Sequence, residues 1–272
     1  MQTAGEKINV ALVTGGSSGI GLAIAHELAK RNYALLLVSN QTAQLAACKT
    51  EIEKMYTVKC FTLTTDLVSV SAAQTVVDFC REQQLQVDVL VNNAGMLVFS
   101  EVADMSIEKL NAILQLHIYT PTMLCRLLGA QMKNRRQGYI LNVSSISSVM
   151  PYPGISLYGP TKTYLRYFTR ALRSEMKEHG VNVTCLLPGA TATALYDPNR
   201  VNIALAKKLR VMHHAAFVAE KAVAALLSGK AECVPGVMNK LTMRLMPLIP
   251  SFTIELINRK TNLLQKGNAS LG

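Results

Sequence analysis

A tyrosine and a lysine, Tyr158 and Lys162, stand four residues apart at the start of a segment with helical periodicity. This spacing places both side chains on one side of a helix. A cation about 4 Å from a phenol, at an effective dielectric constant of about 20, interacts with the phenolate by roughly 4 kcal/mol and lowers the pKa by up to about 3 units. Because a free phenol titrates at about 10, the pair predicts a tyrosine that works as a general acid or base near neutral pH.

Two polar segments are expected to meet this pair at one edge of a sheet. Asn142-Val143-Ser144-Ser145 ends one apolar run, and Ser145 stands thirteen residues before Tyr158. Asn92-Asn93-Ala94-Gly95 ends the preceding apolar run. Doubly wound sheets bind their ligands at the carboxyl edge of the strands. These segments and the tyrosine–lysine pair therefore predict one crevice at that edge.

A glycine-rich turn, TGGSSGIG at residues 14–21, follows the first apolar run and opens a helical segment. Glycines there allow a tight turn and a close approach to a pyrophosphate, and the helix N-terminus offers free N–H donors. Such loops also occur as plain turns, but the strand–loop–helix context favours a dinucleotide site. The second apolar run ends in Ser39-Asn40-Gln41, with no carboxylate to bind a ribose 2′-hydroxyl and no arginine to hold a 2′-phosphate. The sequence therefore favours NADP(H) over NAD(H).

The elements that position these residues alternate along the chain. Short apolar runs typical of buried parallel strands occur at residues 8–13, 34–38, 58–63, 87–91, 139–143 and 181–186. Segments of helical period lie between them, at residues 20–30, 41–54, 71–83, 106–133 and 155–178. This alternation predicts an α/β fold with a doubly wound parallel sheet of the Rossmann type. No linker divides the chain, so we expect one domain, residues 1–235, followed by a C-terminal extension, residues 236–272.

Five motifs resemble, in their order and spacing, the single-domain short-chain dehydrogenase/reductases. They are TGGSSGIG at 14–21, NNAG at 92–95, NVSS at 142–145, YGPTK at 158–162 and PG at 188–189. The resemblance covers roughly residues 8–235. It implies an oxidoreductase that transfers a hydride between a nicotinamide cofactor and a carbonyl or alcohol.

The resemblance also implies roles for individual residues. Tyr158 would protonate a carbonyl oxygen or deprotonate an alcohol, and Lys162 would lower its pKa and bind the nicotinamide ribose. Ser145, rather than Ser144, would orient the substrate oxygen. The cofactor-binding residues that it implies are Gly15, Ser17, Ser18, Gly19, Ile20, Gly21, Ser39, Asn40, Asp66, Asn93, Ala94, Gly95, Tyr158, Lys162, Pro188, Gly189 and Thr193.

Three histidines need separate interpretation. His117 aligns with the family asparagine that holds a water linking the lysine to solvent. We hypothesise that His117 supports a modified proton relay, because imidazole titrates near neutral pH; the alternative is a histidine that only fills the site. His213 and His214 are adjacent, so on a helix they would point to opposite sides without metal-ligand spacing. We therefore predict no metal site and interpret them as part of the pocket rim.

The last quarter of the chain is both basic and apolar. The net charge is +11, and ten of the 28 lysines and arginines lie in residues 201–272, against three glutamates. Residues 195–219, after the proline–glycine turn, are rich in apolar side chains and would cover a hydrophobic substrate. Residues 236–272 form basic amphipathic segments, which could lie on an anionic membrane or pack on the domain or on another subunit.

These observations together predict a reductase that uses NADP(H) on a hydrophobic ketone of the 3-ketoacyl, 3-ketosphinganine or steroid class. The alternatives are NAD-dependent oxidation of an alcohol and a non-catalytic dinucleotide sensor or scaffold. Nucleic-acid binding is suggested by charge alone, because no aromatic platform or recognition motif accompanies it. No signal peptide or membrane span is evident, so we expect a cytoplasmic protein with peripheral membrane contact through residues 236–272. The resemblance implies a homodimer or homotetramer.

Overall fold

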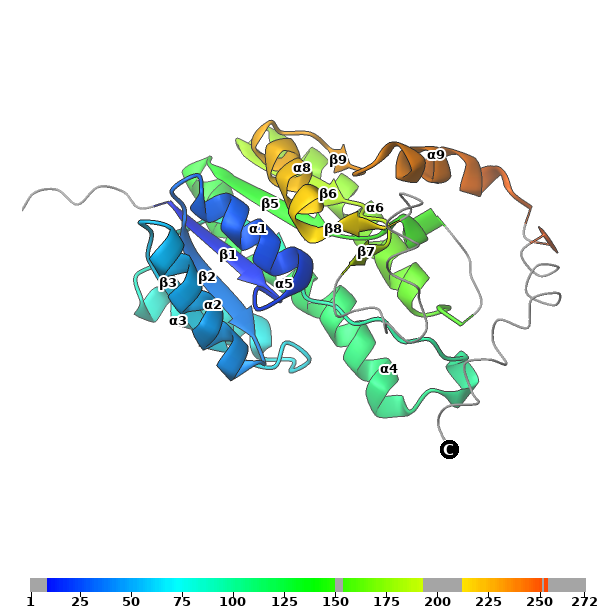
Figure 1. The fold of residues 1–272 in the computed structure, drawn as a ribbon, viewed down its shortest axis with the longest axis horizontal. Helices are drawn as coiled ribbons and strands as arrows, with labels where there is room; N and C mark the ends of the chain where they lie inside the picture. Colours follow the sequence, from blue (N-terminus) through cyan, green and yellow to red (C-terminus); the bar gives the residue numbers. More distant parts are fainter. Residues whose placement is uncertain (1–8, 150–153, 193–211, 251, 254–272) are drawn as a thin grey trace, which may run out of the picture.

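The computed structural model describes residues 9–149, 154–192, 212–250 and 252–253. Parallel strands form one seven-stranded sheet in this part of the chain, in the order β3-β2-β1-β4-β5-β6-β9 (Figure 1). They are β1 (Val10–Thr14), β2 (Ala34–Ser39), β3 (Cys60–Thr64), β4 (Val87–Asn92), β5 (Gly138–Val143), β6 (Val181–Leu186) and β9 (Glu232–Cys233). The order runs outward in both directions from β1 and β4, which confirms the doubly wound parallel sheet.

Helices cover both faces of the sheet (Figure 1). One face is covered by α1 (Gly19–Ala29), α2 (Thr42–Met55) and α8 (Ala215–Leu227), and the other by α3 (Ala72–Glu82), α5 (Thr120–Arg135) and α6 (Tyr158–Lys177). Alternate residues of β1 pack on opposite sides, with Val13 in one core and Leu12 in the other. This two-sided cover explains why the strands are continuously apolar. Each fully buried aliphatic side chain contributes about 1.5–3 kcal/mol to the free energy of unfolding.

All six predicted strands are present, with bounds that differ by at most two residues at either end. The helix predicted over residues 106–133 is wrong in its continuity. The structure has α4 (Ile107–Leu114), a π-helical turn η2 (Gln115–Tyr119) and then α5. Pro121 in the first turn of α5 has no N–H to donate to the carbonyl four residues earlier, so the regular ladder is interrupted there. The wider turn shifts His117 relative to the helix face that a simple periodicity predicts.

The chain after β6 contains elements that the sequence did not predict. β7 (Thr191–Ala192) pairs in parallel with β8 (His213–His214), so the placement of these two histidines on a helix was wrong. β9 adds a seventh strand beside β6. The extension begins with α9 (Val237–Leu245) and the 3₁₀ turn η4 (Met246–Leu248). Two further 3₁₀ turns are η1 (Val102–Asp104) and η3 (Ile146–Val149).

None of the described helices combines the length and the apolar composition that crossing a membrane requires.

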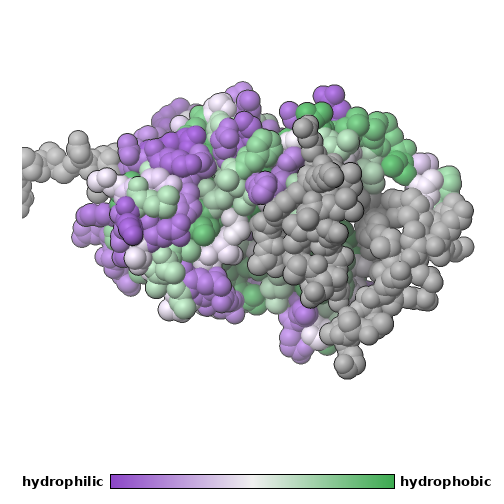
Figure 2. Space-filling model, viewed as in Figure 1, coloured by the Kyte–Doolittle hydropathy of each residue, from purple (hydrophilic) through white to green (hydrophobic). Residues whose placement is uncertain are grey.

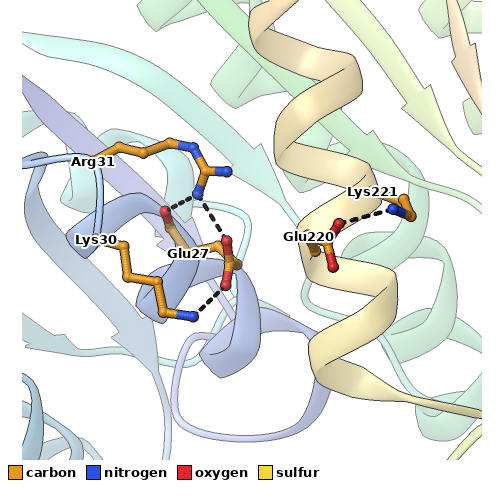
Figure 3. A network of polar contacts seen from close by, with 5 residues as sticks. All are labelled: Glu27, Lys30, Arg31, Glu220 and Lys221. Atoms are coloured by element: carbon orange, nitrogen blue, oxygen red, sulfur yellow. Dashed lines mark hydrogen bonds and ion pairs between the residues drawn. The ribbon is translucent and has the colours of Figure 1, made fainter.

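A polar network lies at the C-terminal end of α1, beside α8 (Figure 3). The Glu27 carboxylate is buried and accepts hydrogen bonds from Lys30 Nζ at 2.6 Å and from Arg31 Nη1 at 2.7 Å. Burial alone would raise the pKa of Glu27, but these hydrogen bonds and the two positive charges hold it below the ordinary value of 4.5. Lys30 and Arg31 are thereby bound to Glu27 at the end of α1 and not to the residues at the end of β2.

We predict that Glu27→Gln lowers the free energy of unfolding at pH 7 by about 1 kcal/mol, because the charged acceptor is lost. The pKa of Glu27 is lowered in the folded state, so this stabilisation is present above pH 4.5 and is lost as the pH falls through the folded-state pKa. Urea unfolding of both proteins at pH 7 and pH 3 measures the difference, with exposed Glu82→Gln as the control. A difference that persists at pH 3 would contradict the assignment.

Candidate active site

A cleft of about 400 Å³ lies at the carboxyl edge of the sheet. Its walls come from the turns after β1, β2, β3, β4, β5 and β6 and from the first turns of α6. The predicted site residues that line it are Gly15, Ser17, Ser18, Gly19, Ile20, Ser39, Asn40, Asp66, Asn93, Ala94, Gly95, Ser145, Tyr158, Lys162, Pro188 and Gly189. Gly21 and His117 lie behind this surface, and Thr193 lies outside the described residues. The structure thus brings most of the predicted cofactor and catalytic residues into one cleft.

The glycine turn needs its glycines for two different reasons. Gly15 has φ +62°, a conformation that L side chains rarely adopt, and its N–H donates to the Val38 carbonyl at 2.8 Å. A Cβ at Gly21 would clash with the Gly15 carbonyl and with the Asn93 amide. Gly15 therefore shapes the cleft wall, whereas Gly21 lets α1 pack closely behind it.

The loop after β4 is fastened to this turn. Thr14 Oγ1 accepts hydrogen bonds from the N–H groups of Asn93 at 3.0 Å and Ala94 at 3.1 Å. The Asn93 side chain donates in return to the carbonyls of Thr14 at 3.0 Å and Gly15 at 3.2 Å. Two walls of the cleft are consequently held together by four hydrogen bonds between neighbouring strand ends.

The end of β2 forms a neutral corner of the cleft. Ser17 Oγ donates to Ser39 Oγ at 2.9 Å, and Ser39 Oγ also accepts from the Gln41 N–H at 3.2 Å. The exposed Asn40 lines the cleft beside them. Asp66 supplies a carboxylate from the neighbouring turn after β3, where its Oδ1 accepts from the Val68 N–H at 3.1 Å. The corner itself therefore carries hydroxyl and amide groups and no negative charge.

Lys162 is a buried cation beside the phenol. Its side chain is enclosed, and Nζ donates to the Val143 carbonyl at 3.0 Å and lies 5.7 Å from the ring centroid of Tyr158. Burial lowers the pKa of Lys162 to about 8, so the ammonium form predominates at pH 7. Gly95 in the β4 loop lies close to this site, since a Cβ there would lie 3.2 Å from His117 Nε2 and would crowd that ring. The geometry places a positive charge close to the Tyr158 ring.

The two serines after β5 have different surroundings. Ser144 is buried, and its Oγ donates to the carbonyl of Lys162 at 2.7 Å, which ties β5 to α6. Ser145 is partly exposed in the cleft, and its Oγ accepts from the Ser147 N–H at 3.1 Å. The Ser145 hydroxyl hydrogen can therefore be donated to a bound oxygen. This difference supports the prediction of Ser145 over Ser144.

His117 occupies the π-helical turn η2 and is 1% exposed. Its Nε2 accepts from the Met96 N–H at 3.0 Å, so the ring proton is on Nδ1 and is donated to Thr161 Oγ1 at 2.9 Å. Thr161 Oγ1 donates in turn to the carbonyl of Tyr158 at 2.8 Å. The His117 ring also packs edge-on against the Tyr158 ring, with centroids 5.6 Å apart.

These contacts bear on the relay hypothesis for His117. Burial, together with the positive charge of Lys162, lowers the pKa of His117 well below 6.5, so the imidazole is neutral. Both ring nitrogens hold hydrogen bonds that connect the β4 loop, η2 and α6. The geometry favours a residue that positions Tyr158 and Lys162 over one that shuttles protons. Sequence reasoning missed Met96 and Thr161, although Thr161 lies inside the YGPTK motif.

His213 and His214 do not appear in the lining of the described cleft. His213 packs against Phe217, with ring centroids 5.1 Å apart, and its ring fills the space beside Gly236. Most of the apolar segment expected to cover a substrate, residues 195–219, lies outside the described residues, which resume at Met212.

The sequence matches the family model described as short chain dehydrogenase over residues 9–203. It is 33% identical over 190 residues to the very-long-chain 3-oxoacyl-CoA reductase-B of Danio rerio, a match that covers 68% of this chain and 60% of that protein. It is 35% identical over 194 residues to the very-long-chain 3-oxoacyl-CoA reductase of Bos taurus, with the same coverage. The matched region thus spans about 60% of the length of these relatives.

The fold is similar to a solved short-chain dehydrogenase from Sphingobium yanoikuyae in complex with NADPH. The TM-score is 0.77, the sequences are 23% identical, and the match covers 95% of both chains. At this identity the likeness shows the fold.

We predict that the neutral, buried His117 makes folding stability depend on pH. Its pKa is lower in the folded state than in the unfolded state, so unfolding takes up a proton below pH 6.5 and the protein loses stability as the pH falls. Between pH 7.5 and 5.5 this loss is about 1.4 kcal/mol. Urea unfolding of the wild type and His117→Asn at both pH values measures it, with exposed His214→Asn as the control. If the free energy of unfolding of His117→Asn changes between pH 7.5 and 5.5 as much as that of the wild type, His117 is not the group responsible.

Proposed function

The chain belongs to the short chain dehydrogenase family, and on that premise we propose that it reduces a ketone on a hydrophobic, lipid-like substrate with NADPH. The observation that carries this proposal is the cleft itself, where Ser145, Tyr158 and Lys162 meet the glycine turn. Oxidation of the corresponding secondary alcohol uses the same residues in the reverse direction.

The residues present fit a nicotinamide dinucleotide. The turn that leads into α1 is shaped by the positive φ angles of Gly15 and Gly19, and the first turn of α1 would offer N–H donors to a pyrophosphate. Asp66 would contact the adenine, and Pro188 and Gly189 would lie along the carboxamide at the other end of the cleft. When bound, the cofactor supplies the hydride.

The protein's own residues would handle the oxygen and its proton. Ser145 Oγ donates a hydrogen bond that orients the carbonyl oxygen, and Tyr158 gives that oxygen its phenolic proton as reduction proceeds. The fixed ammonium of Lys162 stabilises the phenolate that results. Because Val143 and Ser144 hold Lys162 at both its side chain and its backbone, the charge does not need to move during the reaction.

Reprotonation of Tyr158 requires a path that does not use the neutral His117. A small cavity of about 10 Å³ lies behind the cleft, lined by Lys162, His117 and Asn92 among others. Asn92 Oδ1 is buried and has no hydrogen-bond partner among the described residues. The cavity has about the volume of one water molecule. Such a water would accept a hydrogen bond from Lys162 Nζ and donate one to Asn92 Oδ1. We propose this water as the link between Lys162 and solvent.

NADPH is preferred in this proposal because of the neutral corner at the end of β2. Ser39, Asn40 and Gln41 offer hydroxyl and amide groups to a 2′-phosphate, and no carboxylate from this turn repels it. The preference therefore rests on the absence of repulsion at that turn.

A hydrophobic substrate is supported by two observations. Met96 and Leu116 add apolar side chains to the lining of the cleft. Relatives at 33% and 35% identity are named very-long-chain 3-oxoacyl-CoA reductases. We propose a substrate of the 3-ketoacyl, 3-ketosphinganine or steroid class.

We also propose a cytoplasmic homodimer or homotetramer that assembles through the long helices. Tyr164 and Tyr167 on α6 and Tyr119 at the end of η2 are exposed. Exposed aromatic side chains of this kind are enriched at subunit interfaces.

We predict that Tyr158→Phe lowers turnover of a ketone by about a thousandfold, because the proton donor is removed. NADPH binding, followed by protein fluorescence, should stay within about twofold of the wild type, because the ring and its packing on His117 are kept. Tyr167→Phe, an exposed change on the same helix, is the control. Substantial turnover by Tyr158→Phe would overturn the mechanism.

For the cofactor preference, we predict that Asn40→Asp weakens NADPH binding by about tenfold and leaves NADH binding unchanged. A carboxylate at this corner would repel a 2′-phosphate, and a tenfold change corresponds to about 1.4 kcal/mol. Fluorescence titration of both cofactors measures it, with Asn40→Gln as the neutral control. Equal affinity of the wild type for NADPH and NADH would remove the basis of the preference.

A further inference from the structure

The extension carries a concentrated apolar surface on the outside of the domain. Sixteen large hydrophobic side chains are exposed among the described residues, and seven of them lie within residues 237–252. We call this set the α9 apolar face; its members are Val237, Met238, Leu241, Leu245, Leu248, Ile249 and Phe252. Figure 2 shows hydrophobic atoms gathered at the upper right, where Figure 1 places α9.

The opposite side of α9 is anchored in the domain. Asn239 is 5% exposed and donates from Nδ2 to the Pro235 carbonyl at 2.7 Å. It packs so closely on the turn after β6 that a Cβ at Gly189 would clash with it. The helix also packs on η3, which follows Ser145. Rotation of α9 to bury its apolar residues would break these contacts, so the α9 apolar face is directed outward by the fold.

The spacing of the exposed side chains makes one continuous stripe. Met238, Leu241 and Leu245 stand at positions i, i+3 and i+7 of the helix, and these positions share one face. The stripe continues into η4 with Leu248, which is 75% exposed. A contiguous apolar surface of this kind marks a place where another apolar phase or partner binds.

The charge beside the stripe has one sign. Lys240 and Arg244 are exposed on α9, and residues 237–253 contain no aspartate or glutamate. Two copies of the chain that met through this face would bring identical cations together, which is unfavourable. An anionic lipid surface complements both the apolar stripe and the flanking cations.

We propose that the α9 apolar face docks on an anionic lipid bilayer, with Leu241, Leu245 and Leu248 inserted and Lys240 and Arg244 on lipid phosphates. Asn239 packs against Gly189, and Gly189 lines the cleft, so docking holds the cleft close to the lipid surface. A ketone dissolved in the bilayer then has a short path to Tyr158. This last consequence rests on the proposed function, whereas the docking itself does not.

Co-sedimentation of the full chain with phospholipid vesicles tests the docking. We expect binding to vesicles that contain phosphatidylserine, and about tenfold weaker partitioning for the double variant Leu241→Glu/Leu245→Glu. The matched control is Val70→Glu/Ile107→Glu, which places the same charges at exposed apolar positions elsewhere. Thermal unfolding of each variant checks that it is folded.

The charge requirement is tested separately. Lys240→Gln/Arg244→Gln should weaken binding to phosphatidylserine vesicles, and Lys109→Gln/Lys133→Gln should leave it unchanged. Pure phosphatidylcholine vesicles should bind the wild type more weakly, and added salt should weaken binding to phosphatidylserine, because it screens exposed charges.

Three results would overturn the proposal. The first is that the wild type binds neither kind of vesicle. The second is that Leu241→Glu/Leu245→Glu binds phosphatidylserine vesicles as well as the wild type does. The third is that the wild type binds no vesicles but forms a dimer, and that Leu241→Glu/Leu245→Glu is a monomer. The last result would assign the face to a second copy of the chain. Reduction of a short, water-soluble ketone by Leu241→Glu/Leu245→Glu should equal that of the wild type. If the wild type reduces no ketone but binds vesicles, the proposed function fails and the docking stands.

Discussion

A single ammonium group held inside the protein is the constraint on which the site depends. Burial opposes the charge of Lys162, so the fold must hold a carbonyl close to Nζ, and Val143 at the end of β5 supplies it. The backbone of the same lysine is bound by Ser144, so strand and helix cannot shift independently. Gly95 lets the β4 loop pack closely on His117, since a Cβ there would lie 3.2 Å from His117 Nε2. One buried cation therefore fixes how the end of β5 lies against α6.

The neighbouring histidine follows from the same constraint. A protonated imidazole next to the ammonium would place two positive charges in a buried site, and His117 is kept neutral by burial and by that charge. As a neutral ring it accepts from Met96 and donates to Thr161, and so joins the β4 loop to the helix that carries Tyr158. Its place in a π-helical turn fits the tendency of such turns to occur at functional sites.

Local patterns made much of this predictable from the sequence. Strands covered on both faces are continuously apolar, and the glycine turn and the Tyr158–Lys162 spacing are set within a few residues. What escaped prediction depends on distant partners. The β9 strand is two residues long and exists only because it pairs with β6. The hydrogen bonds of His117 reach residues 21 and 44 positions away, which no local pattern can reveal.

The cations of the chain differ in their surroundings. The cleft holds one buried lysine, whereas exposed cations accompany the apolar residues of α9, which packs on the turn beside the cleft. The central claim is that the cleft transfers a hydride from the cofactor to a ketone carbon. Deuterated NADPH, incubated with 3-ketoacyl thioesters, 3-ketosphinganine and ketosteroids, tests it by mass spectrometry of the products. The account predicts an alcohol that carries the cofactor's deuterium on its carbinol carbon. Bound NADPH that transfers no deuterium to any of these ketones would contradict it.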